Sequence, residues 1–188
     1  SGLAIEEIVV TARKREENLI DIPIAVTAFS SAKIEAVGVK DLQELSRFTP
    51  GLSVANQGTG FGGRLFSGIR FRGMNQSVLT PTNQVGALFV DGIYFLGGAQ
   101  SVGFDDIERV EVIRGPQAAY FGRSTFGGAI NYITRDPGDE VSGQINGEYS
   151  PNFDSFAVSG AIEGPIVGEK VTARVSAGIR RKGAQYTA

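Results

Sequence analysis

The stretch that decides the fold is residues 105–137, DDIERVEVIRGPQAAYFGRSTFGGAINYITRDP. It begins with an acidic turn, in which a carboxylate oxygen is expected to accept amide protons that have no other partner. Val110 and Val112 then alternate with Glu111, and this period of two is typical of a half-buried strand. The first third of the segment therefore predicts a turn through Glu108 and then a strand.

The remainder of this segment predicts a short helix between two strands. Arg114-Gly115-Pro116 ends the first strand, and its proline suits the first helical position, where no amide proton is needed. Residues 117–121 make little more than one helical turn, and Gly122 suits the left-handed conformation that ends a helix. Gly127-Gly128 permit a close turn before a second strand, predicted over residues 129–134.

The chain before this segment predicts a mixture of short strands and short helices. Ser30-Ser31 can cap the first predicted helix, and the second helix would place Leu42, Leu45 and Phe48 on one packed face. Asp91-Gly92 between two β-rich runs indicates a hairpin turn. The predicted strands cover residues 22–29, 64–72, 87–90 and 93–95, and the predicted helices cover residues 32–37 and 40–48.

Three segments after Pro137 alternate strictly between apolar and polar residues. They are residues 141–149, 156–163 and 171–180. Transmembrane β-barrels need this pattern, with apolar side chains toward lipid, and about 9–11 residues cross a bilayer when the strand is tilted. A soluble antiparallel sheet with one wet face shows the same alternation. The pattern alone leaves both interpretations open.

The composition excludes several classes of function. The chain has 188 residues with 18 basic and 20 acidic side chains, and this near balance argues against a nucleic-acid partner. It contains no cysteine and no histidine, which excludes disulfides and Cys/His zinc sites and argues against hydrolytic triads. No catalytic residues, metal ligands or cofactors are therefore predicted, and the protein is not expected to be an enzyme.

Four segments, in order, resemble the plug domain of TonB-dependent outer-membrane receptors. They are IEEIVVTA at residues 5–12, FTPGLSV at residues 48–54, LFVDGIYF at residues 88–95 and the run over residues 107–137. The resemblance implies an α+β plug domain, with a small mixed sheet and short helices, followed by the first antiparallel strands of a transmembrane β-barrel. The barrel interpretation of the three alternating segments is therefore preferred.

The resemblance also divides the chain. It implies a TonB box and flexible tether at residues 1–18, a plug domain at residues 19–137 and the first three barrel strands at residues 138–188. Three strands cannot close, and plugged outer-membrane barrels use about 22. The chain is thus expected to be the N-terminal portion of a larger receptor in the outer membrane of a Gram-negative bacterium, with the plug inside the barrel and the N-terminus in the periplasm.

The N-terminal segment is the predicted site for a protein partner. On the sequence alone, residues 5–12 are either an edge strand or a detachable strand that adds to the sheet of a partner. The resemblance implies that this segment binds the periplasmic domain of TonB, which is driven by an inner-membrane complex. The residues to which it assigns this contact are Glu7, Ile8, Val9, Val10 and Thr11.

Two arginines, Arg72 and Arg114, each follow an apolar strand and precede a glycine. Taken alone, they are solvent-facing strand ends. The resemblance implies instead that they face carboxylates of the barrel wall and lock the plug in place. The nearby acidic cluster has two further interpretations, a metal site or ordinary capping and pairing, and the second is preferred; its members are Asp105, Asp106, Glu108 and Glu111.

Small-molecule binding is expected on two loops of the plug that follow FTPGLSV and LFVDGIYF. Amide groups and an aromatic ring there suit hydrogen bonding and stacking better than charge capture. The residues are Asn56, Gln57, Phe61, Gly98 and Gln100.

The resulting prediction is TonB-energised import of a small ligand, such as an iron chelate, cobalamin or a saccharide, through a receptor in contact with outer-membrane lipid. The alternatives are a signal-transducing surface receptor and a soluble β-rich binding module without transport. The short stretch before Ile5 favours transport over signalling.

Overall fold

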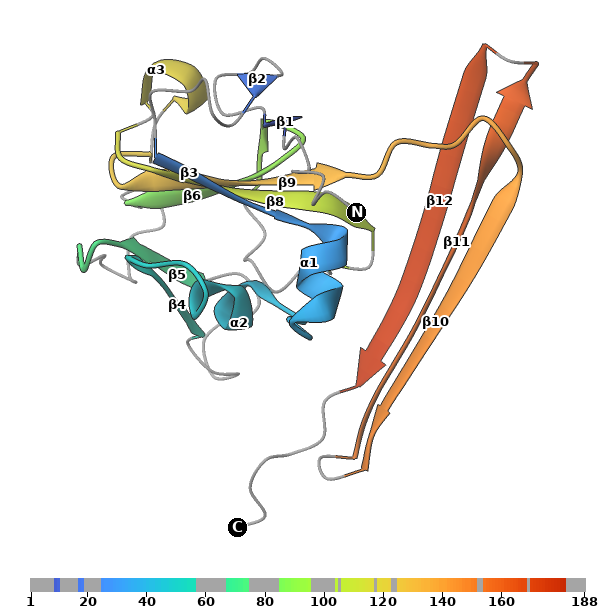
Figure 1. The fold of residues 1–188 in the computed structure, drawn as a ribbon, viewed down its shortest axis with the longest axis horizontal. Coiled ribbons are helices and arrows are strands. Elements are labelled where there is room, and N and C mark those ends of the chain that lie inside the picture. Colours follow the sequence, from blue (N-terminus) through green and yellow to red (C-terminus); the bar gives the residue numbers. More distant parts are fainter. Residues whose placement is uncertain are drawn as a thin grey trace, which may run out of the picture. The chain divides into compact units, whose positions relative to one another are not determined.

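The structure is a computed structural model (Figure 1), and it describes residues 9–10, 17–18, 25–56, 67–74, 85–95, 104, 106–116, 118–122, 125–151, 154–168 and 170–181. The chain divides into two compact units, Ser1–Thr134 and Arg135–Ala188. The first unit combines short helices with strands, and the described part of the second unit is a sheet.

The first unit is built on a five-stranded mixed sheet in the order β3-β8-β9-β6-β7. β6 and β9 run parallel, and the other neighbours are antiparallel. This arrangement confirms the predicted small mixed sheet. Its strands are β3 (Ala25–Ser30), β6 (Gly86–Val90), β7 (Ile93–Tyr94), β8 (Ile107–Arg114) and β9 (Gly128–Thr134).

The deciding segment forms β8, α3 (Ala118–Phe121) and β9 in the predicted order. Gly115 and Gly122 have φ angles of 100° and 82°, which glycine adopts without steric cost. Two local predictions are wrong. The helix begins two residues beyond Pro116, and Glu108 lies within β8, at a break in the register between β8 and β9, rather than in a turn.

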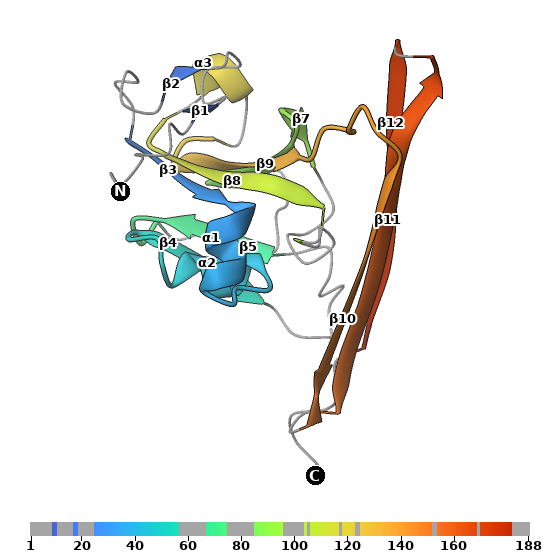
Figure 2. The same ribbon diagram turned by 45° about the vertical axis from the view of Figure 1, so that its right-hand side comes forward.

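The prediction of a half-buried strand is also wrong for β8, because both of its faces are covered. Val110, Glu111, Val112 and Ile113 are all fully buried. Figures 1 and 2 show why: α1, α2, β4 and β5 cover one face of the sheet, whereas α3 and the short strands β1 (Val9–Val10) and β2 (Glu17–Asn18) lie over the other.

The first covering layer consists of α1 (Ser31–Ala36), α2 (Leu42–Ser46) and the antiparallel pair β4 (Leu52–Asn56) and β5 (Ser67–Phe71). Ser30 caps α1 as predicted, since its hydroxyl accepts a hydrogen bond from the Lys33 amide at 3.4 Å. Asp41 caps α2, where its carboxylate accepts from the Glu44 amide at 3.0 Å.

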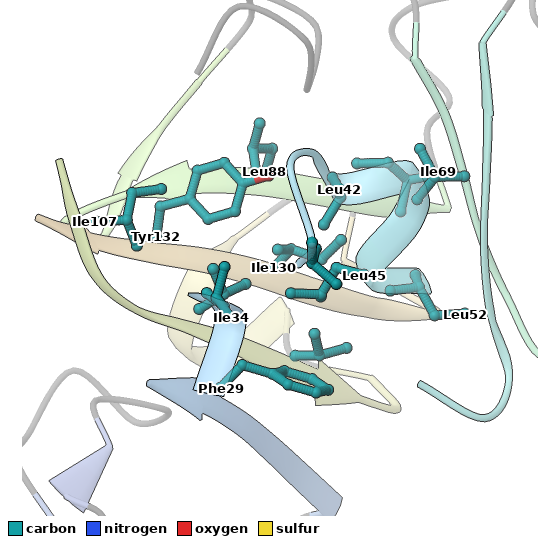
Figure 3. Packing of buried hydrophobic residues seen from close by; sticks show 14 of the residues in the cluster. Phe29, Ile34, Leu42, Leu45, Leu52, Ile69, Leu88, Ile107, Ile130 and Tyr132 are labelled. Carbon is teal, nitrogen blue, oxygen red and sulfur yellow. The ribbon is translucent and has the colours of Figure 1, made fainter. Parts of the chain in front are cut away.

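The main core lies between this layer and the sheet (Figure 3). Ile34 from α1 and Leu42 and Leu45 from α2 pack with Ile130 and Tyr132 of β9. Phe48, which was predicted to share this packed face, is 51% exposed, because α2 ends at Ser46 and Phe48 lies in the following turn.

The second unit is a three-stranded antiparallel sheet that confirms the three alternating strands. Its strands are β10 (Ser142–Ser150), β11 (Ser155–Val167) and β12 (Val171–Arg181), in chain order. The apolar side chains of each strand share one face and are exposed; Ile145, for example, is 86% exposed. Such an extended apolar face needs a cover other than water.

The polar face of this sheet carries an interaction that crosses all three strands. Ser142, Glu163 and Arg174 are directly opposite one another in the register. The Glu163 carboxylate accepts from the Ser142 hydroxyl at 2.8 Å and from Arg174 at 2.6 Å.

Among the described residues, no helix is both long and apolar enough to cross a membrane.

Candidate functional site

The described part of the N-terminal segment, β1, lies against the main sheet of the first unit. Val9 and Val10 pair antiparallel with Asn18 and Glu17. The Val10 side chain is completely buried in a second apolar cluster, on the face of the sheet opposite the main core. Its other buried members are Ala28, Ala87, Phe89, Ile113, Phe121 and Ala129.

The predicted partner-binding strand is thus held in two ways, by its pairing with β2 and by the Val10 side chain. Alanines at positions 28, 87 and 129 leave room for a close approach to the sheet. Only Val9 and Val10 of the five predicted contact residues are described, and for Val9 this extends to the backbone alone; Glu7, Ile8 and Thr11 lie outside the described residues.

The two predicted locking arginines meet at Pro50-Gly51, which comes from FTPGLSV. The Arg72 amide donates to the Gly51 carbonyl at 2.7 Å, and the Arg114 guanidinium donates to the Pro50 carbonyl at 3.4 Å and to the Thr27 hydroxyl at 3.2 Å. Two of the four sequence motifs, residues 48–54 and 107–137, therefore meet at this point together with Arg72, although they are far apart in the chain.

The environment of these arginines is unusual for surface cations. Arg72 has a φ angle of 49°, a left-handed conformation that non-glycine residues adopt infrequently. The Nε atoms of Arg70 and Arg114 are buried without a hydrogen-bond partner among the described residues. Arg70 was not singled out from the sequence, although it lies in the same GIRFRG run as Arg72.

The acidic cluster forms ion pairs. Arg109 Nε lies 3.0 Å from a Glu111 oxygen, and Arg109 Nη1 lies 2.6 Å from a Glu108 oxygen. Glu111 is fully buried, although its position in the alternating run predicts an exposed side chain. Asp106 lies in the turn before β8, Asp105 lies outside the described residues, and no group of acidic residues that could hold a metal ion occurs in the described chain.

A second structural element missed from the sequence is the seat of Phe71. A Cβ atom added at Gly86 would lie 2.6 Å from the Phe71 ring, and one added at Gly128 would lie 2.8 Å from it. Gly127 is similarly crowded, at 3.1 Å from the Phe71 Cβ. The ring therefore lies directly against backbone and fixes the end of β5 to the sheet.

The predicted hairpin turn in LFVDGIYF is confirmed and is tied to β9. Asp91 and Gly92 both have positive φ, at 49° and 75°. The Asp91 carboxylate accepts from the amide and the hydroxyl of Thr134 at 2.9 and 2.8 Å, and the Gly92 amide donates to the Asn131 side chain at 3.0 Å. The turn is therefore held against β9 by side chains on both elements.

The predicted ligand-binding residues fall mainly outside the described structure. Asn56 is the last residue of β4, and its side chain is not described. Gln57, Phe61, Gly98 and Gln100 lie outside the described residues. Their assignment stays a prediction.

Comparison with known proteins identifies the class of this fold. Residues 18–129 match the TonB-dependent receptor plug domain. The chain is 33% identical to the pesticin receptor of Yersinia pestis over 144 residues, which are 76% of this chain and 21% of that receptor. It is 35% identical to the vitamin B12 transporter BtuB of Vibrio vulnificus over 135 residues, which are 69% of this chain and 20% of that protein.

The crystal structure of the ferric yersiniabactin uptake receptor FyuA from Yersinia pestis has the same fold. The two structures superpose with a TM-score of 0.71 at 31% identity, covering 82% of this chain and 24% of that one. The family match covers more than half of the chain, so the protein belongs to the TonB-dependent receptors.

Membership of this family confirms several predictions. The chain has the α+β plug and the antiparallel strands with which the barrel starts. It belongs to the outer membrane of Gram-negative bacteria, and the family consists of receptors and transporters rather than enzymes. The chain spans about a fifth of the length of the curated relatives that it matches, at 18–21% for the pesticin receptors and BtuB of Vibrio vulnificus.

Proposed function

We propose that this chain is the N-terminal part of a receptor that imports a small ligand across the outer membrane with energy supplied through TonB. The observation that carries the proposal is the environment of Val10, a side chain buried within the plug although it lies in the segment that resembles the TonB box. A short strand with two residues paired on one edge is suited to transfer onto the sheet edge of a partner.

In this proposal, Glu7, Ile8, Val9, Val10 and Thr11 pair with the periplasmic domain of TonB. Main-chain hydrogen bonds to an extended segment would supply much of the affinity, as they do in strand addition generally. A pull on this segment would reach β2 and then β3, which is the first strand of the main sheet along the chain and lies at its edge. Peeling an edge strand breaks its hydrogen bonds in succession.

Arg72 and Arg114 are proposed to hold the plug to carboxylates of the barrel. Support comes from their convergence on Pro50-Gly51 and from the buried Nε of Arg114, which has no hydrogen-bond partner among the described residues. Guanidinium groups bind carboxylates with favourable planar geometry. The strained backbone of Arg72 is consistent with a position that function requires.

The proposed substrate class is an iron chelate, cobalamin or a saccharide, recognised in part by Asn56, Gln57, Phe61, Gly98 and Gln100. The first two members of this class are supported by relatives named for ferric yersiniabactin uptake and vitamin B12 transport. An iron chelate is preferred because FyuA is similar over 82% of this chain.

Uptake by intact cells tests this function. The full receptor would be produced in a Gram-negative strain without its own receptors for ferric yersiniabactin and vitamin B12, and accumulation of each labelled compound measured with and without TonB. The proposal predicts accumulation of one compound only when TonB is present. Surface binding of a probe without accumulation would favour a signalling receptor, and accumulation independent of TonB would contradict the energised mechanism.

A further inference from the structure

In the plug sheet, paired glycines and paired alanines leave little more than the backbone of β6 and β9 between the two covering layers. Gly86 pairs with Gly128, and the adjacent Ala87 pairs with Ala129, in the parallel ladder between β6 and β9. Successive residues of a strand point to opposite faces. The two glycines therefore face the layer of β4 and β5, and the two alanines face the layer of β1 and α3.

On the first face, the Phe71 ring occupies the space that side chains would otherwise fill. Added Cβ atoms at Gly86 and Gly128 would lie 2.6 and 2.8 Å from its ring carbons, so the ring rests against the strands themselves. Phe71 is completely buried. A displacement of this ring therefore acts on the β6–β9 backbone directly, without a flexible side chain between them.

On the opposite face, Ala87 and Ala129 are completely buried in the same apolar cluster as Val10. Because alanine is small, the packing of Val10 depends on where the backbone of β6 and β9 lies. Close-packed interiors have few voids and transmit displacements rather than absorbing them. Phe71 and the Val10 cluster thus contact neighbouring rungs of one ladder from opposite sides.

We propose that the position of Phe71 controls how firmly the N-terminal segment is docked on the plug. Phe71 is joined to Arg72, whose backbone conformation is strained and whose amide is held by Gly51 at 2.7 Å. A change in what Arg72 contacts would shift Phe71, move the two glycines and loosen the seat of Val10. The importance of that loosening for transport rests on the proposed function; the coupling between the two faces does not.

Hydrogen exchange in the full receptor, in outer-membrane vesicles, tests this coupling. Phe71→Leu is expected to raise the exchange rate of the peptide over residues 5–20 by about fivefold or more, a magnitude common for coupled sites. Exchange in β8 should stay unchanged, since this central strand reports opening of the whole plug. The matched control is Phe48→Leu, which changes an exposed ring that lies outside the glycine seat.

A substitution on the opposite face of the sheet provides a second test if the Phe71→Leu receptor does not assemble. Val10→Ala should raise the exchange of β5, because coupling between two sites is reciprocal. Gly86→Ala should act like Phe71→Leu, and Gly147→Ala, where an added Cβ has nothing within 4 Å, should have no effect. An unchanged N-terminal peptide, or an equal rise in β8, would overturn the coupling.

Binding of a purified periplasmic TonB domain to the unmodified receptor would be measured in the same preparations. If TonB binds and the exchange of residues 5–20 does not respond to Phe71→Leu, the coupling fails and the proposed function stands. If the exchange responds and TonB does not bind, the coupling stands and the proposed partner is wrong.

Discussion

The two units of this chain place apolar side chains of alternating strands in opposite environments. In the first unit, Val112 and Ile130 are completely buried under layers formed by the chain itself. In the second unit, Ile145, Ile162 and Val175 are 86%, 61% and 66% exposed. Hydrophobic periodicity alone therefore does not determine burial; what covers the strand does. For the second unit, family membership identifies lipid as the expected cover.

The carboxylates of two ion pairs also differ in exposure between the units. Glu111 in β8 is inaccessible to solvent and lies 3.0 Å from Arg109. Glu163 in β11 retains 19% side-chain exposure and lies on the polar face of its sheet. The buried Glu111 charge therefore depends on its protein partners, whereas the Glu163 carboxylate keeps some access to water.

The largest expected effect is therefore in the plug. Arg109→Ala removes the cation beside a fully buried carboxylate and is expected to destabilise the plug by about 3–5 kcal/mol. Urea unfolding of the full receptor in detergent, followed by a probe in the plug, measures this. Arg181→Ala, an exposed cation at the end of β12, is the control and should change stability by less than about 0.5 kcal/mol. Equal effects would contradict the distinction between the units.

A charge on the apolar face of the second unit should have the next largest effect. Ile145→Arg places a cation at the centre of the face assigned to lipid, and the expected cost is about 2–4 kcal/mol. The neighbouring Asn146→Arg, on the polar face, should have little effect. Folding into lipid vesicles, measured by heat-modifiable migration in gels, compares the two. A tolerated Ile145→Arg with a harmful Asn146→Arg would reverse the assigned faces.

The smallest expected effect concerns a polar atom in the main core. The Tyr132 hydroxyl is buried without a hydrogen-bond partner among the described residues, and burial raises the pKa of this phenol well above its usual range. Because the folded-state pKa lies above the unfolded value of about 10, stability should be unaffected below pH 10 and fall as pH rises further. Tyr132→Phe should change stability by less than about 1 kcal/mol at pH 7.

The pH dependence of Tyr132→Phe gives the more specific test. Unfolding midpoints of the receptor between pH 9 and pH 11, a range set around the phenol's usual pKa of about 10, should fall less steeply in this variant than in the unmodified protein. Tyr94, which is only partly buried, supplies the matched control Tyr94→Phe. If both variants retain the same alkaline slope as the unmodified protein, burial of Tyr132 does not account for it.

Much of the fold could be predicted from local sequence. Ser30 as a helix cap, Asp91-Gly92 as a turn and the alternation in β10, β11 and β12 depend on residues close together in the chain. The errors at Pro116 and Phe48 concern element ends, where one or two residues decide the boundary.

The remaining features depend on contacts between distant segments. The burial of Glu111 follows from β3 and β9 pairing on either side of β8 and from layers on both faces. The seat of Phe71 requires β6 and β9 to be parallel neighbours, which brings Gly86 beside Gly128. No spacing in the sequence indicates either arrangement. Glu111, Gly86 and Gly128 can be seen in the sequence, but their environments follow only from the order and direction of the strands.

The central claim is that the N-terminal segment is a strand that TonB takes up, and binding of a periplasmic TonB domain to the full receptor tests it most directly. Val9→Pro removes an amide donor, whereas Val9→Ala shortens the side chain and keeps that amide. We predict that the unmodified receptor and Val9→Ala bind TonB and that Val9→Pro does not. Equal binding by all three would contradict strand addition through this segment.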